Sequence, residues 1–344
     1  MGKTMLDIQK VNILSGGGGD CFLVDIEGMG TACLPASQIP KIFTADALLL
    51  PDGKTSIDRR LQQIGGTNLI DNPLFSINQR GVTSWTDGYG LDRYSCNSAT
   101  AYVVDQGVRV VSGAKAFSCI QQPIDYPANN GDVLTLSALV KGDSGFRLVI
   151  GRAYDESNAA KNIPASDDWE LVSLTTTLSN LRLLVAKIDH PEAVAGDEIF
   201  IRGWKLEPGP FQTLAHQEGK TWVLNEIPNY TLELFKCKRY QRVFNYNTTS
   251  YGVFYGHTTS ATTANVFLPV DVPMRANPAI SDTDGSNWLC TVDGQTITPK
   301  SIAPWFASRN AIGIRVNGDF PMGKGHALML SSNSEKNVIF DANL

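Results

Sequence analysis

Histidine and cysteine are the side chains in this sequence best suited to metal binding or nucleophilic chemistry. Zinc sites place such ligands in close pairs, but here they are scattered, with no CxxC pair and no histidine beside a cysteine. They occur at His190, His216, His257, His326, Cys21, Cys33, Cys96, Cys119, Cys237 and Cys290. The spacing predicts no metal centre and no dense disulfide scaffold, and we expect buried free thiols.

Two segments contain half of a phosphate-binding loop, Gly53-Lys54-Thr55 and Gly219-Lys220-Thr221. A complete loop has a further glycine five residues before the second one, so that backbone N–H groups can surround the phosphates. Leu48 and Leu214 stand at those positions instead. Neither segment is expected to bind a nucleotide, and the sequence predicts no cofactor.

Signals for hydrolytic chemistry are equally incomplete. The turn Gly142-Asp143-Ser144-Gly145 is similar to the nucleophile turn of trypsin-like proteases, but Phe146 replaces the next glycine and every histidine follows the serine. No GxSxG elbow is present. A carboxylate pair such as Asp87 and Asp92 could serve a glycosidase only at a spatial separation that sequence does not define. We therefore predict a turn at Ser144 and a protein that is not an enzyme.

The composition favours short strands over long helices. Charged residues make up 18% of the 344 residues, while 31 Gly and 17 Pro accompany many Thr, Ser and Asn. With 29 Lys and Arg against 34 Asp and Glu, the net charge is −5, so no nucleic-acid partner is expected. No apolar stretch approaches the ~18–20 residues of a membrane span. We expect a protein made in the cytoplasm, without a signal peptide or membrane insertion.

The first 50 residues form a segment of their own, which we predict to be a small β module. Gly-rich stretches separate its short β runs, and the turn signal Pro51-Asp52-Gly53 follows it. The runs are Val11–Leu14, Cys21–Ile26 and Thr31–Leu34.

Residues 51–67 contain this turn and one short predicted helix. Ile57, Leu61 and Ile64 repeat along it at helical spacing and form a single apolar stripe. A helix this short is unstable alone, so we predict that three symmetry-related copies pack along the stripe. The alternative is a linker helix that lies on its own domain.

From residue 68 onward the chain is a succession of β runs separated by turns. In residues 68–210 the runs alternate in polarity with no helix between them, which is typical of an antiparallel jelly-roll sandwich. Residues 211–344 add one predicted helix, 230–244, and a second β domain, so the expected fold class is all-β. The predicted strands are Ala101–Val104, Gly107–Val111, Ala116–Gln122, Asp132–Val140, Phe146–Tyr154, Trp169–Leu178, Leu181–Ile188, Glu198–Leu206, Tyr251–His257, Asn265–Val270, Trp288–Val292, Ala311–Val316 and Val338–Phe340.

One stretch is specific. Residues 68–81, NLIDNPLFSINQRG, followed by YGLDRY at 89–94, resemble the opening of a jelly-roll domain found in tail fibres and tail proteins of bacteriophages and prophages. That family reads roughly N-L-L-x-N-x-x-F-x-x-N-Q-R-G, then a Gly/Tyr-rich loop and D-R-W. Tyr94 departs from the usual Trp. Three later segments also resemble the family, in its order: Gly203–Gly209, Glu233–Tyr240 and Leu268–Pro278, the last with extra residues at Val270–Pro273.

The resemblance covers residue 68 to the C-terminus and implies a structural protein of the virion. It implies a homotrimeric fibre, assembled in the host cytoplasm, that displays carbohydrate-binding-like β domains and adheres to a host cell-surface glycan. We assign attachment to other virion proteins to residues 1–50, which match none of the family's motifs. A head fibre or capsid decoration protein without a required ligand is the alternative, and a glycan depolymerase is the least favoured one. The sequence does not separate head from tail.

Sugar recognition needs an aromatic plate for the C–H faces of the sugar and polar groups for its hydroxyls. Aromatic residues gather near the Gly-rich loop and in the last domain, at Trp85, Tyr89, Tyr94, Tyr102, Tyr246, Tyr251, Tyr255 and Trp305. The preferred glycan-binding candidates are Tyr251, Tyr255 and Trp305 in tip loops of the last domain, with Trp85 and Tyr89. Each could instead be a core or subunit-contact residue. We expect Asn78, Gln79 and Arg80 to have structural roles.

Overall fold

The computed structural model describes residues 11–16, 21–26, 30–35, 66–113, 118–153, 156–244, 254–281, 283–307, 311–320, 325, 327–332 and 338–343. Its contacts divide the chain into two units, Met1–Gly66 and Thr67–Leu344. Within the described residues, no helix combines the length and the apolar character needed to cross a membrane.

The first unit contains a three-stranded antiparallel sheet in the order β1-β2-β3. Its strands are β1 (Val11–Gly16), β2 (Cys21–Ile26) and β3 (Gly30–Pro35), which confirms the three predicted β runs. Ile57, Leu61 and Ile64 of the predicted trimerising helix lie outside the described residues, so that helix stays a prediction.

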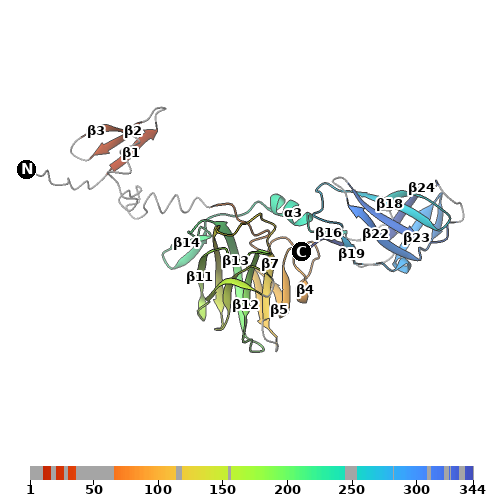
Figure 1. Cartoon of the computed structure of the whole chain (residues 1–344), viewed down its shortest axis with the longest axis horizontal. Coiled ribbons are helices and arrows are strands. Elements are labelled where there is room, and N and C mark those ends of the chain that lie inside the picture. The colour runs from red at the N-terminus through yellow and green to blue at the C-terminus, as the bar shows by residue number, and fades with distance from the viewer. Residues whose placement is uncertain are drawn as a thin grey trace, which may run out of the picture. The chain divides into compact units, whose positions relative to one another are not determined.

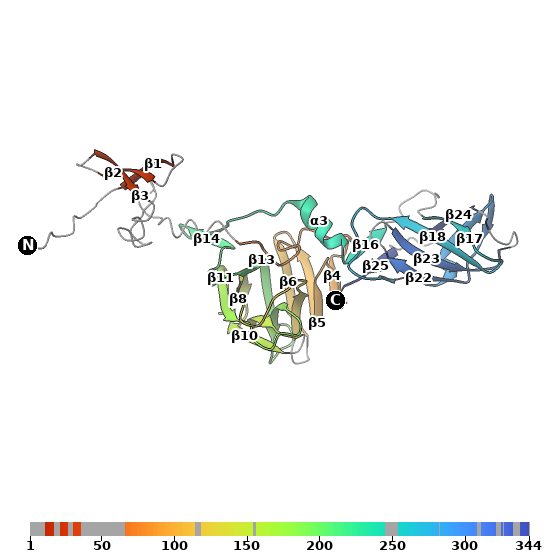
Figure 2. The ribbon, with the colours of Figure 1, turned by 45° about the horizontal axis from the view of Figure 1, so that its top comes forward.

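The second unit begins with a ten-stranded antiparallel sheet, in the order β10-β9-β12-β7-β5-β6-β13-β8-β11 with β4 beside β5. Figure 1 shows these strands standing side by side, and Figure 2 shows the same group turned. The strands are β4 (Ser84–Tyr89), β5 (Ser95–Val104), β6 (Gly107–Ser112), β7 (Ser118–Pro123), β8 (Val133–Gly142), β9 (Arg147–Gly151), β10 (Ser157–Asn162), β11 (Ser166–Thr177), β12 (Val185–His190) and β13 (Glu198–Pro208).

This sheet folds over on itself to make two layers. Strand β5 belongs to both, because residues 99–104 pair with β6 whereas residues 95–97 pair with β7. The far end of the sheet returns toward its beginning, since β11 contacts both β9 and β10. The result is a jelly-roll-like sandwich, and the predicted all-β fold class is confirmed.

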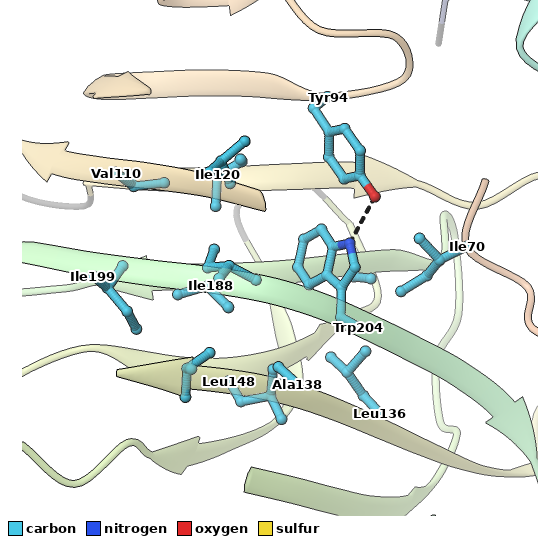
Figure 3. Packing of buried hydrophobic residues seen from close by; sticks show 14 of the residues in the cluster. Ile70, Tyr94, Val110, Ile120, Leu136, Ala138, Leu148, Ile188, Ile199 and Trp204 are labelled. Atoms are coloured by element: carbon cyan, nitrogen blue, oxygen red, sulfur yellow. Dashed lines mark hydrogen bonds between the residues drawn. The ribbon is translucent and has the colours of Figure 1, made fainter. Parts of the chain in front are cut away.

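The core of the sandwich takes alternate residues along the strands, and on β13 a register shift between Ile201 and Gly203 interrupts this alternation. On β13, Ile199 and Ile201 are fully buried, while Phe200 between them is only half-buried and lies on the opposite face. Further along the same strand, Trp204 enters the core beside Leu136, as Figure 3 shows. The face opposite the core is therefore the one that carries Phe200.

A hairpin covers part of that outer face. Its strands are β14 (Ala215–Glu218) and β15 (Thr221–Leu224). A small apolar cluster joins it to the sheet and consists of Leu139, Leu214 and Ala215 with Trp169, Leu171, Trp222 and Leu224. Lys205 and Glu207 of β13 are also buried, with Nζ and Oε2 3.6 Å apart. Outside this hairpin, Phe200 on the outer face is only half-buried.

A helix and two further sheets follow. Helix α3 spans Tyr230–Lys238, with the Asn229 side chain as its N-cap. The prediction that the helix continues to 244 is wrong, because Gln241–Phe244 pairs with Val338–Asp341 as a strand. The sheets have the orders β16-β25-β19 and β21-β20-β24-β17-β18-β23-β22. Their strands are β16 (Gln241–Phe244), β17 (Phe254–Thr258), β18 (Thr263–Pro269), β19 (Ala279–Ile280), β20 (Trp288–Val292), β21 (Gln295–Ile297), β22 (Ser301–Ala307), β23 (Ala311–Asn317), β24 (Ala327–Ser332) and β25 (Val338–Asp341), with a short 3-10 helix at Gly285–Asn287.

The motif at residues 68–81 leads into the jelly roll. Hydrogen bonds of Asn72 stabilise its turn and connect it to helix α3. The fully buried Asn72 side chain donates to the Ile77 and Asp92 carbonyl oxygens and accepts from the Ile77 amide at 2.8 Å. The Asn72 amide itself donates to Glu233 of α3 at 2.8 Å. Asn72 therefore fixes the loop that leads into the sandwich and links it to the helix.

Two arginines of the motif reach the part of the chain that follows helix α3. Arg80 donates to the Gln241 side chain at 2.6 Å and forms an ion pair with Asp341 at 2.8 Å. Arg93 forms an ion pair with Asp71 at 3.0 Å, and its guanidinium carbon lies 3.4 Å from the centre of the Tyr240 ring.

Asn78 and Gln79, which precede Arg80 in the motif, also form side-chain hydrogen bonds within the protein. The Gln79 side chain bonds to Asp92 and to the Gln241 carbonyl, and that of Asn78 donates to the Val82 carbonyl. The structural roles predicted for Asn78, Gln79 and Arg80 are confirmed.

Candidate functional site

Five side chains form a row across the outer face of the jelly roll, and aromatic and cationic groups alternate along it. Strand register places Tyr102 of β5 opposite Arg109 of β6, Arg109 opposite Phe200 of β13, and Phe200 opposite Lys141 of β8. Trp169 of β11 continues the row, since its ring lies 5.4 Å from the Lys141 Nζ. We call Tyr102, Arg109, Phe200, Lys141 and Trp169 the outer row.

The contacts along the outer row are cation–π contacts. The Arg109 guanidinium carbon lies 4.6 Å from the centre of the Tyr102 ring, and the Lys141 Nζ lies 5.2 Å from that of Phe200. Such distances give a favourable electrostatic interaction, because the face of an aromatic ring is negative. Glu198 also pairs with Arg109 at 3.3 Å. All five side chains of the row are half-buried, so each keeps part of its surface open to a ligand.

A hollow of about 530 Å³ lies at one end of the row. Its volume is within the range of small-ligand sites, ≈ 300–1,000 Å³. It combines two rings, three hydroxyl-bearing side chains and a guanidinium, and its walls are Thr83, Ser84, Tyr102, Val103, Val104, Arg109 and Phe200. This combination offers apolar plates for stacking together with hydrogen-bond donors and acceptors around them.

A second aromatic face occurs in the C-terminal domain and contains two of the residues predicted from sequence. Tyr255 is 59% exposed and Trp305 is 42% exposed. Phe267 lies opposite Tyr255 in the sheet, and its ring centre is 6.1 Å from that of Trp305. Phe306 packs edge-on against Trp305 at 5.0 Å, and Arg315 lies 5.5 Å over the same indole. The structure therefore brings Tyr255 and Trp305 to one sheet.

Their predicted place in tip loops is wrong, however. Tyr255 belongs to β17 and Trp305 to β22, and both strands are part of the seven-stranded sheet. Tyr251, the third candidate of that group, lies outside the described residues.

Trp85 and Tyr89, the two glycan-binding candidates near the Gly-rich loop, are less exposed than Tyr255 and Trp305. Trp85 is buried, 8% exposed, and is part of the jelly-roll core. Its indole fits against Gly90, where an added Cβ would lie 2.1 Å from the Trp85 Cγ. Trp85 is therefore unavailable as a stacking plate, which corrects the prediction. Tyr89 is half-buried on β4, and its carbonyl accepts a hydrogen bond from Arg80.

The two carboxylates considered as a glycosidase pair in the sequence, Asp87 and Asp92, have different surroundings. Asp92 is buried and accepts hydrogen bonds from Gln79, whereas exposed Asp87 accepts from the Ser98 amide at 2.6 Å. Each carboxylate therefore holds a different part of the backbone. Among the described residues, no three His, Cys, Asp or Glu side chains are grouped in a way that could hold a metal ion.

The four cysteines whose side chains the structure describes are buried thiols. Cys96, Cys119, Cys237 and Cys290 are free and buried, which confirms the prediction for these four. Burial raises the pKa of the Cys119 thiol and of the Cys290 thiol to about 11, so both are protonated at neutral pH.

Comparisons with known proteins add a set of solved structures. No family model matches this chain, and no curated protein does. A solved CBM4 structure is similar at 18% sequence identity and a TM-score of 0.30. The similar region covers 41% of this chain and 99% of the CBM4 chain. A mutant of a family 29 carbohydrate-binding module is similar at 13% sequence identity and a TM-score of 0.27. The similar region covers 37% of this chain and 91% of the module's chain.

Proposed function

We propose that this protein is a bacteriophage virion protein, a fibre that adheres to its host by binding a cell-surface glycan without cleaving it. The observation that carries the binding function is the hollow at the outer row, where Tyr102 and Phe200 flank Arg109. An aromatic ring presents an apolar plate to the C–H face of a sugar, and a guanidinium donates in a fixed fork to its oxygens.

The rigidity of the scaffold supports this assignment. The three side chains stand on adjacent strands of one sheet, so backbone hydrogen bonds rather than loops set their spacing. Sites on strands hold their geometry better than sites on loops, which reduces the entropy that binding costs. A sugar polymer could therefore lie across the strands with little rearrangement.

The virion assignment rests on the sequence motifs, whose side chains bond the jelly roll to the segments after it. We propose a homotrimer formed along Ile57, Leu61 and Ile64, with residues 1–50 attached to other virion proteins. Three linked weak sites can raise the overall affinity by ~10²–10⁴ without any new contact. A head fibre or decoration protein is the alternative.

The aromatic face of the C-terminal domain is a second candidate site. Its support is the exposure of Tyr255 and Trp305 on one sheet, which would otherwise leave two large apolar side chains in water. The outer row differs from this face in that a hollow of about 530 Å³ lies at one end of it.

The experiment uses the full-length protein and a panel of purified bacterial wall polysaccharides. Retention of the protein on a polysaccharide, with no new reducing ends, is the expected result. New reducing ends would establish a depolymerase and contradict the binding-only function. If the protein is retained on no polysaccharide, the glycan-binding proposal fails and the decoration protein is the remaining function.

A further inference from the structure

Lys141 differs from the other basic residue of the outer row in its partners. Arg109 has a carboxylate partner in Glu198, whereas the described residues give Lys141 no ion pair. Its ammonium lies between two rings instead, 5.2 Å from the centre of Phe200 and 5.4 Å from that of Trp169. Aromatic rings attract the charge but are weak acceptors for its three N–H donors. The ammonium is thus held beside two rings, and among the described residues no carboxylate pairs with it.

The positions of the two cations suggest which anion would fit. Arg109 and Lys141 stand on β6 and β8, with β13 between them. Neighbouring strands lie ≈ 4.8 Å apart, so the backbone positions of Arg109 and Lys141 are about 10 Å apart along the row. Phe200 occupies the middle position. An extended disaccharide has a comparable length, so one sugar can stack on the Phe200 ring while acidic groups on both sides of it reach the cations.

From this arrangement we propose that the outer row selects an acidic polysaccharide with a carboxylate on every second sugar. The inference rests on the proposed glycan-binding function and specifies its substrate class. Lys141 forms a charge-assisted hydrogen bond with one sugar carboxylate, and Trp169 and Phe200 stack on the sugars beside it. Arg109 faces the next carboxylate and is weaker there, because Glu198 already shares its charge.

The net charge of −5 does not oppose this selectivity. At physiological ionic strength charges more than about 8 Å apart are largely screened, so the groups in contact with the ligand decide the preference. In the outer row these groups are the Lys141 ammonium and the Arg109–Glu198 pair.

The test compares one polysaccharide in two chemical forms. Hyaluronan carries a hexuronate on every second sugar, and reduction of its carboxyl groups to alcohols removes the charge but keeps the chain. Calorimetry with the full-length protein is expected to give a Kd at least about tenfold higher for the reduced form, the usual effect of losing a charge-assisted hydrogen bond. Cellohexaose serves as a neutral probe.

Three variants assign the effect to Lys141. Lys141→Gln should abolish most of the preference for the acidic form, and Lys141→Arg should keep it. The control is Lys300→Gln, which removes the same charge from an exposed pair with Asp319. A thermal melt checks that each variant folds. If Lys141→Gln does not fold, the two forms of hyaluronan still decide the acidic selectivity, and Lys141→Met replaces Lys141→Gln as the test of Lys141.

The outcomes separate the two proposals. Equal binding of hyaluronan and its reduced form, or binding of cellohexaose alone, overturns the acidic selectivity while glycan binding stands. A preference for the acidic form that survives in Lys141→Gln overturns the role of Lys141. Binding to none of the three carbohydrates contradicts the acidic-ligand inference, whereas the proposed function is judged by the panel of wall polysaccharides described above.

Discussion

The indole Nε1 of Trp204 donates a hydrogen bond to the hydroxyl oxygen of Tyr94 at 2.7 Å, across 110 residues of sequence (Figure 3). The Tyr94 hydroxyl donates in turn to the Asn72 carbonyl at 2.9 Å. Both rings are fully buried, and Phe75 packs 4.7 Å from Tyr94. The Tyr94 hydroxyl thus supplies the acceptor that the buried indole N–H of Trp204 requires.

Replacing Tyr94 by Phe should therefore destabilise the jelly roll by about 1–3 kcal/mol, since the buried Trp204 N–H would lose its acceptor. Urea denaturation measures the free energy of unfolding. Tyr230→Phe is the matched control, because Tyr230 is 57% exposed and its change should stay within about 0.5 kcal/mol. Equal effects of the two substitutions would show that the Tyr94 hydroxyl contributes nothing specific.

The stability should also depend on pH through Asp92. Burial raises the pKa of its carboxyl from 3.8 to about 6, although hydrogen bonds from Gln79 act in the opposite direction. The folded state therefore binds the proton more tightly than the unfolded chain. This contribution to stability is fully present below about pH 3.8 and is lost as the pH rises through about 6. The loss is on the order of 3 kcal/mol.

Comparison with Asp92→Asn isolates this contribution, because all other titrating groups are shared. The unfolding free energy of the native protein should fall relative to that of the variant between pH 4 and pH 7. A difference that stays constant over this interval would contradict a raised pKa for Asp92, as would a carboxyl NMR titration with a midpoint near 4.

Arg80 should be important for holding the C-terminal strands to the jelly roll. Its guanidinium bonds to Gln241, Asp341 and the Tyr89 carbonyl, and its side chain is only 15% exposed. Arg80→Ala should cost about 1–3 kcal/mol and accelerate hydrogen exchange in β16 and β25. Arg109→Ala, in a pair that is about one-third exposed, should have a much smaller effect on stability. Unchanged exchange in both strands would refute this role of Arg80.

Local patterns in the sequence identify strands but not their neighbours. The predicted runs Cys21–Ile26 and Trp288–Val292 match β2 and β20 at both ends, because alternation and turn residues are local signals. Helix α3 ends earlier than predicted, since the pairing of Gln241–Phe244 with a strand near the C-terminus is not a local signal.

The candidate site likewise depends on which strands are neighbours in the sheet, and local sequence patterns do not give this. Arg109 and Phe200 lie on strands that the sequence predicts, yet their contact requires that β6 and β13 be neighbours. Trp85 shows that long-range contacts can also bury a residue that the sequence predicts to be exposed. Its polar neighbours on β4 suggest an exposed residue, but the missing side chain of Gly90 leaves space for the indole to be buried.

The predicted trimer can be tested without knowledge of the ligand. Multi-angle light scattering of the full-length protein at micromolar concentration should give three times the mass of the 37.3 kDa chain. Leu61→Asp places a charge in the apolar stripe and should yield monomers, because burying an unpaired carboxylate is costly. A monomeric native protein, or a trimer unaffected by the substitution, would reject this helix as the trimerising element.

The central claim is that the outer row binds a glycan, and calorimetry on Tyr102→Ala tests it most directly. For a polysaccharide that retains the native protein, removal of this ring should raise the Kd at least about tenfold, as expected for an aromatic hot spot. Trp305→Ala examines the second aromatic face, and Tyr230→Ala is the control at an exposed tyrosine outside both. A Kd unchanged in Tyr102→Ala but raised in Trp305→Ala would contradict the outer row as the binding site.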